Sequence, residues 1–156
     1  MNQVVPMEIG IVVSDMDCMI NFYTRVLGLE LISDLRSDAS ASAKVGTTPN
    51  GYRIVRMKTN YGDRVKMVRT DGDVGSPPAP PAWVYERMGI CYLTFVVSDM
   101  ADIIAALKAN NVKMLCTEAY DVRPGVNCLN IVDPEGNFVE FVQYADVKSY
   151  RPELFQ

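Results

Sequence analysis

The 156 residues of this sequence include no histidine. The side chains left as candidates for proton transfer or nucleophilic chemistry are carboxylates, lysines, tyrosines and thiols. Histidine is the commonest proton carrier near neutral pH and the commonest ligand of catalytic zinc, iron and copper. Its absence excludes catalysis by Ser-His and Cys-His pairs. Acid–base chemistry in this chain would therefore depend on carboxylates and their neighbours.

The thiols show no spacing typical of a redox or metal site. Cys18, Cys91, Cys116 and Cys128 form no C-x-x-C pair, and three of them lie in apolar stretches. We therefore expect buried, reduced thiols, with a disulfide in a secreted protein as the alternative.

The overall charge disfavours two classes of partner. Fifteen Lys and Arg residues against nineteen Asp and Glu residues give a net charge of −4, which provides no basic field for a nucleic acid. No segment approaches the roughly 18 apolar residues of a membrane helix, and the first residues lack the pattern of a signal peptide. We expect a cytoplasmic protein that binds neither nucleic acid nor membrane.

An internal repeat organises the chain. The sequence Val12-Val13-Ser14-Asp15-Met16 recurs letter for letter as Val96-Val97-Ser98-Asp99-Met100. Each copy follows a predicted strand, at 8–13 and 91–97, and its Asp is suited to begin a helix. Gly28 ends the first helix, and Asn110-Asn111 stands at the corresponding place in the second.

Three more strands are predicted after each helix, so both halves have the order β-α-β-β-β. They lie at 29–35, 52–58 and 65–69 in the first half, and at 113–117, 128–132 and 138–144 in the second. We expect one domain, with module 1 at about 4–70, a Pro-rich linker at about 71–88, module 2 at about 89–146 and a tail at 147–156. The loop at 37–50 is either a flap over a pocket or a surface insertion.

These motifs resemble those of the vicinal oxygen chelate superfamily, which includes glyoxalases, bleomycin-resistance proteins and extradiol dioxygenases. The similar segments are the strand that closes on Val-Val-Ser-Asp-Met, the helix with Asn21-Phe22-Tyr23 and Leu27-Gly28-Leu29, and the final Asp133-Pro134-Glu135-Gly136-Asn137-Phe138-Val139-Glu140-Phe141. The resemblance implies an α+β fold in which two βαβββ modules form a half-open mixed β-barrel with the helices packed outside. It also implies a homodimer, with each barrel built within one chain or across two.

The resemblance also implies four site positions, because metal-using relatives take their ligands from the first and fourth strands of each module. Here these positions hold Glu8 and Lys66 in module 1, and Tyr92 and Glu140 in module 2. Relatives such as dioxygenases have His, His and Glu at three of them. A lysine would repel a divalent ion, so we expect no metal cofactor, with Mg²⁺ or Mn²⁺ held by Glu8 and Glu140 as the alternative.

Without a metal, these four residues suggest a lyase or isomerase that uses acid–base chemistry. Glu140 or Glu8 would remove a proton alpha to a carbonyl, while Lys66 or Tyr92 stabilises the developing oxyanion. The alternative is that Lys66 only neutralises the two carboxylates in an ion-paired core network.

Further residues are predicted to bind the substrate, which is a small molecule. Strand alternation places Arg64 on the face of Lys66, Thr94 on that of Tyr92 and Phe138 on that of Glu140. Pairing across the turn at Asn60 places Arg53 near Arg64, and Trp83 in the linker is a candidate lid residue. Together with Lys66, the two arginines would make the rim of this half-barrel positive, which suits a carboxylate-bearing ligand.

The competing functional hypothesis is a non-catalytic protein that binds or sequesters a small molecule, as antibiotic-resistance relatives do. Four ionisable groups in one cavity favour an enzyme, because desolvating them without a purpose would be costly.

Overall fold

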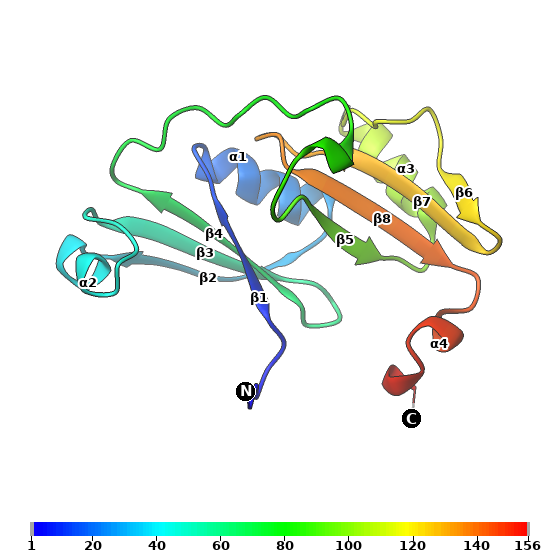
Figure 1. The fold of residues 1–156 in the computed structure, drawn as a ribbon, viewed down its shortest axis with the longest axis horizontal. Helices are drawn as coiled ribbons and strands as arrows, with labels where there is room; N and C mark the ends of the chain where they lie inside the picture. Colours follow the sequence, from blue (N-terminus) through cyan, green and yellow to red (C-terminus); the bar gives the residue numbers. More distant parts are fainter. Residues whose placement is uncertain (1, 156) are drawn as a thin grey trace. The chain divides into compact units, whose positions relative to one another are not determined.

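The computed structural model describes residues 2–155. The chain divides between Pro78 and Ala79 into two compact units, and each unit contains one copy of the repeat. We call them the first unit and the second unit. Figure 1 shows each as a twisted sheet with a helix on one side.

The first unit contains one four-stranded sheet and has the predicted β-α-β-β-β order, with one additional short helix between its second and third strands. Its sheet has the order β1-β4-β3-β2, with β1 parallel to β4 and the other pairs antiparallel. Its elements are β1 (Glu8–Val12), α1 (Met16–Asn21), the π-helical turn η1 (Phe22–Val26), β2 (Glu30–Ser37), α2 (Ala39–Lys44), β3 (Tyr52–Lys58) and β4 (Arg64–Thr70).

The second unit repeats this plan, with the sheet order β5-β8-β7-β6 and β5 parallel to β8. Its elements are η2 (Val84–Glu86), β5 (Tyr92–Val96), α3 (Met100–Ala109), β6 (Tyr120–Arg123), β7 (Val126–Val132), β8 (Phe138–Tyr144), α4 (Val147–Tyr150) and η3 (Pro152–Leu154). The α+β class and the two βαβββ modules are therefore confirmed.

The helices begin and end at the predicted residues. Asp15 accepts a hydrogen bond from the backbone N–H of Cys18 at 2.9 Å, and Asp99 accepts one from that of Ala101 at 2.7 Å. Gly28 follows the first helical segment with φ of 77°, and Asn111 adopts a φ of 55° after α3. Asparagine thus takes the left-handed conformation that glycine takes in the first repeat.

Each unit has its core between the helix and one face of the sheet. In the first unit, Val55, Met57 and Met67 alternate inward and are fully buried, together with Met19 and Tyr23 of the helical segment. In the second unit, Leu129, Ile131 and Val139 are buried in the same way. We call the opposite face of each sheet its open face.

Two predicted segments differ from the structure. Residues 113–117 are not a strand, since only Met114 forms an isolated bridge, to Ile131. The strand that completes this sheet is β6 instead. Its four residues are all exposed, so it lacks the buried apolar face by which a strand is recognised in a sequence. The loop at 37–50 contains α2, which buries Ser42, and Thr48 is hydrogen-bonded to Thr70 at 3.1 Å.

The cysteines are free, as expected, but they are less buried than predicted. Cys18 is exposed on α1 because it lies on the outer side of a short helix, and the other three are half-buried. None of the helices within residues 2–155 has the length and hydrophobicity needed to span a bilayer.

Candidate functional site

Strand register arranges the open face of the first sheet in rows of neighbouring side chains, because paired residues on adjacent strands point to the same side. Three rows follow one another along the strands. The ion-paired row is Glu8, Arg64, Lys58 and Glu30; the cationic row is Gly10, Lys66, Arg56 and Ser33; the apolar row is Val12, Val68, Ile54 and Leu35.

Glu8 is held by two guanidinium groups. Arg64 Nη1 donates to Glu8 Oε1 at 3.1 Å, and Arg56 Nε lies 3.5 Å from Oε2. Partial burial raises the pKa of Glu8, but the hydrogen bonds and charges of the two arginines outweigh it, so the pKa lies below its ordinary value of 4.5. Glu8 is therefore a fixed carboxylate at neutral pH.

Lys66 differs from its neighbours because it forms no ion pair with any residue between 2 and 155. Its side chain passes over Gly10, where an added Cβ would lie 3.6 Å from Lys66 Cε. Lys58 in the adjacent row pairs with Glu30 at 3.0 Å. The open face thus presents one ammonium group whose charge is not balanced by a described carboxylate.

The expectation that Arg53 lies beside Arg64 and Lys66 is wrong. Arg53 pairs with Arg69 in the β3–β4 register, whereas Arg56 lies opposite Lys66. The two arginines are separated by an odd number of positions, so Arg53 points to the helix side of the sheet.

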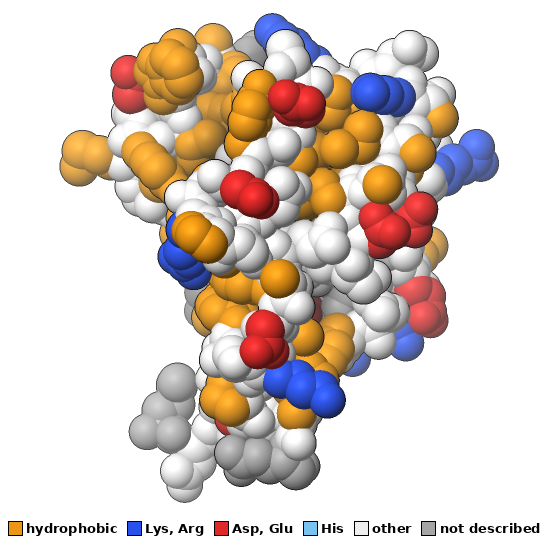
Figure 2. Space-filling view, turned by 90° about the vertical axis from the view of Figure 1, so that its right-hand side faces the viewer, with side chains coloured by type: hydrophobic (Ala, Val, Ile, Leu, Met, Phe, Trp, Pro, Cys, Tyr) orange, Lys and Arg blue, Asp and Glu red, His pale blue; other side chains and the backbone are white. Residues whose placement is uncertain are grey.

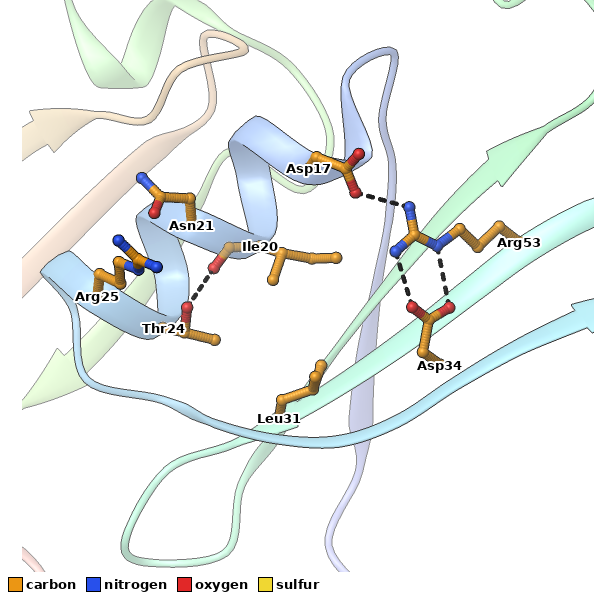
Figure 3. Close-up of a pocket in the computed structure, with 8 residues that line it drawn as sticks. All are labelled: Asp17, Ile20, Asn21, Thr24, Arg25, Leu31, Asp34 and Arg53. Carbon is orange, nitrogen blue, oxygen red and sulfur yellow. Dashed lines mark hydrogen bonds and ion pairs between the residues drawn. The ribbon is translucent and has the colours of Figure 1, made fainter.

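Arg53 instead joins the helix to the edge strand (Figure 3). Its guanidinium donates to both oxygens of Asp34, at 2.9 and 2.7 Å, and to Asp17 Oδ1 at 2.7 Å. These hydrogen bonds hold the pKa of Asp34 below its usual range. An open hollow of about 370 Å³ adjoins the three residues, but the charge of Arg53 is already balanced there by two carboxylates.

The open face of the second sheet also forms three rows. The aromatic row is Tyr92, Phe138 and Val132; the polar row is Thr94, Glu140 and Asn130; the third row is Val96, Val142, Cys128 and Tyr120. Tyr92, Thr94, Phe138 and Glu140 therefore share one face, as predicted, but Phe138 is fully buried on it. Glu140 occupies the position in β8 that Lys66 occupies in β4, so the two repeats place opposite charges at equivalent sites.

Glu140 lies between two largely apolar rows. Thr94 Oγ1 donates to Glu140 Oε2 at 2.8 Å, while no donor within residues 2–155 is hydrogen-bonded to Oε1. No lysine or arginine of the described chain forms an ion pair with it. One carboxylate oxygen is thus fixed and the other is available.

Tyr92 lies beside Tyr85 of η2, with ring centroids 5.9 Å apart. Its hydrogen bond to Tyr85 raises the pKa of Tyr92 above 10, and the charges of Tyr85 and Glu140 act in the same direction. Burial raises the pKa of the Cys128 thiol, and the charge of Glu140 adds to this effect. At neutral pH the phenol is a hydrogen-bond donor and the thiol is not a nucleophile.

The remaining predicted residue, Trp83, lies just before η2 and is 71% exposed.

Two residues that the sequence analysis did not predict are Arg56, which lies opposite Lys66, and Asn130, which lies opposite Glu140. Extending the pairing across the turns at 59–62 and 133–136 residue by residue would have found both. Figure 2 shows scattered single charges among hydrophobic side chains on one face of the molecule.

The site positions do not fit a divalent metal. In the first unit the only carboxylate of the pair, Glu8, is occupied by two arginines, and its companion is an ammonium group. In the second unit Glu140 has a hydroxyl and an amide beside it rather than a second anionic ligand. No cluster of three or more His, Cys, Asp or Glu side chains within residues 2–155 is placed to hold a metal ion.

Comparison with known proteins gives a family and a fold. The family model described as Glyoxalase/Bleomycin resistance protein/Dioxygenase superfamily matches residues 3–141. A glyoxalase family protein from Bacillus cereus is similar in structure, with a TM-score of 0.77 and 19% identity over 93% of this chain and 97% of that one. The trypanothione-dependent glyoxalase I of Leishmania major has a TM-score of 0.60 and 20% identity, over 95% and 91% of the chains. No curated protein sequence matches.

Proposed function

Because the chain belongs to the Glyoxalase/Bleomycin resistance protein/Dioxygenase superfamily, we propose that it is a small-molecule enzyme of this superfamily that works by acid–base chemistry. Its substrate carries a carbonyl or carboxylate group, and the reaction is that of a lyase or isomerase. The observation that carries this proposal is the Glu140 carboxylate, fixed through one oxygen by Thr94 and free of an ion pair with the described residues.

In this proposal Glu140 Oε1 removes a proton alpha to the substrate carbonyl. The electron pair of the broken C–H bond forms a C=C bond to the carbonyl carbon, and the π pair of the carbonyl moves onto its oxygen, which becomes an oxyanion. The Asn130 amide and the protonated Tyr92 phenol are the donors on the same face that would stabilise it. Return of the proton to another carbon completes an isomerisation, and loss of a leaving group completes an elimination.

Glu8 is less suited to the role of base. Its two arginine partners favour its charged form and lower its pKa, so it binds a proton weakly at neutral pH. Its role in the proposal is to position Arg64 and Arg56.

The proposal requires no metal, because the side chains at the implied ligand positions are better suited to binding and proton transfer. An ammonium group and an arginine-bound carboxylate oppose binding of a cation in the first unit. The second unit supplies a lone carboxylate with neutral neighbours.

The test is proton exchange in D₂O. The protein is incubated with a panel of small 2-oxo acids, aldehydes and ketones, and loss of each substrate's alpha-proton signal is followed by ¹H NMR. We expect exchange for at least one compound, loss of exchange in Glu140→Gln, and full exchange in Glu118→Gln, an exposed residue of the same unit. Full exchange by folded Glu140→Gln would contradict the assignment.

The second candidate function is binding without turnover. The half-buried Tyr92 and Val132 and the exposed Val96 favour it, because they would contact the hydrocarbon part of a ligand. Phe138 and Val142, which lie on either side of Glu140 in β8, are themselves buried. Saturable binding of a compound without exchange, unchanged in Glu140→Gln, would favour this alternative.

A further inference from the structure

The open face of the first sheet has two adjoining rows of opposite character. Lys66 and Arg56 supply the positive charges of the cationic row. The apolar row next to it consists of Val12, Val68, Ile54 and Leu35. Alternate residues of a strand are about 6.6 Å apart, and this is the distance between the two rows. A small organic molecule is long enough to contact both rows at once.

The apolar row is not covered at its ends. Val12 is 66% exposed and Leu35 is 54% exposed, while Val68 and Ile54 between them are half-buried. A row of large aliphatic side chains across all four strands gains free energy when a hydrocarbon surface removes it from water. The ligand that suits it is therefore partly apolar.

The charges select the other end of the ligand. Glu30 pairs with Lys58, and Glu8 is shared between Arg64 and Arg56, whereas no carboxylate within residues 2–155 pairs with Lys66. Gly10 leaves space beside the lysine stem, and Arg56 lies opposite. This arrangement attracts an oxyanion and repels a cation.

We propose that this face binds an amphipathic organic acid, with its carboxylate on Lys66 and Arg56 and its hydrocarbon part on the apolar row. The inference rests on the proposed function in that the ligand is a carboxylate-bearing small molecule, and it adds which residues select it. Glu8 is a positioning residue here, because it holds Arg56 and Arg64 in place.

Binding of phenylacetate to the full chain tests the inference, with the Gly10 amide signal and calorimetry as readouts. We expect saturable binding that shifts the Gly10 signal, with weaker binding of acetate, inorganic phosphate and the neutral phenylacetamide. Lys66→Met should weaken binding about tenfold or more, whereas Lys66→Arg keeps most of it. Val12→Thr should weaken phenylacetate binding about threefold and leave acetate unchanged.

Lys58→Met is the matched control, since Lys58 lies on the same face but is paired with Glu30. We expect it to change the affinity less than about twofold. The inference is overturned if phenylacetate does not bind, if phenylacetamide or phosphate binds as tightly, or if both Lys→Met variants, folded by circular dichroism, weaken binding equally.

Because these readouts measure binding, they separate this inference from the proposed function. Binding through Lys66 with no proton exchange on any compound would contradict only the enzyme proposal. Exchange that depends on Glu140, with no phenylacetate binding that depends on Lys66, would contradict only the inference.

Discussion

Thr94 and Glu140 lie opposite each other on the parallel strands β5 and β8, and the threonine hydroxyl donates a hydrogen bond of 2.8 Å to the glutamate. Because this bond orients the proposed base, Thr94→Val should lower the rate of proton exchange about tenfold. Thr94→Ser keeps the hydroxyl and should keep most of the rate. Equal rates for the valine and serine variants would show that the bond has no positioning role.

Glu8 should make stability depend on pH in the acid range. Its folded pKa lies below the ordinary 4.5, so its contribution is present above about pH 4.5 and disappears as the pH falls through the lower folded value. Glu8→Gln should lower the free energy of unfolding by about 1 kcal/mol at pH 7. Urea unfolding should give converging values for the two proteins as the pH approaches 3.

Glu30→Gln is the control for this experiment, because the Glu30 side chain is 68% exposed and has a single lysine partner. We expect a smaller change in stability from it. A loss from Glu8→Gln that is the same at pH 3 and pH 7 would show that the arginine contacts are not its source.

Arg53 should contribute to stability but not to ligand binding. Its three hydrogen bonds join α1, β2 and β3 on the helix side of the sheet. Arg53→Met should lower the free energy of unfolding by about 1 kcal/mol, since its partners are partly exposed. Phenylacetate affinity should stay within about twofold in Arg53→Met and fall in Arg56→Met. The reverse order would place the anion on the helix side.

Tyr144 should ionise at a higher pH than an ordinary tyrosine because it is partly buried and hydrogen-bonded to Tyr150, whose ring lies 3.9 Å from its own between centroids. Burial, followed by the hydrogen bond to Tyr150, raises the pKa of Tyr144 to about 12. Its contribution to stability is therefore present below about pH 10 and lost as the pH rises through the folded value. In a ¹³C-tyrosine NMR titration, Tyr150→Phe should lower this pKa, while Tyr61→Phe should leave it unchanged.

Much of the fold was predictable because the residues that begin and end helices, and the apolar residues that alternate along strands, take the positions in the structure that their types favour. The Ser-Asp repeat, Gly28 and Asn111 mark both helices, and the apolar alternation marks most strands. Edge strand β6 was missed because all its residues are exposed, so neither face of it carries a hydrophobic pattern.

The site was predictable to the extent that alternation along a single strand determines it. Arg64 shares a face with Lys66, and Thr94 shares one with Tyr92, as expected. Contacts between strands depend on register, and an error of one position moves a side chain to the other face. For this reason Arg53 was assigned to the wrong side, and Arg56 and Asn130 were not found.

The proposed role of Glu140 predicts chemistry that does not depend on a divalent ion. The most direct measurement is alpha-proton exchange in D₂O after treatment with a chelator, with and without added Mg²⁺ or Mn²⁺. We predict the same rate under all three conditions and no exchange by Glu140→Gln. Loss of exchange in the chelator and its recovery with Mn²⁺ would contradict the account.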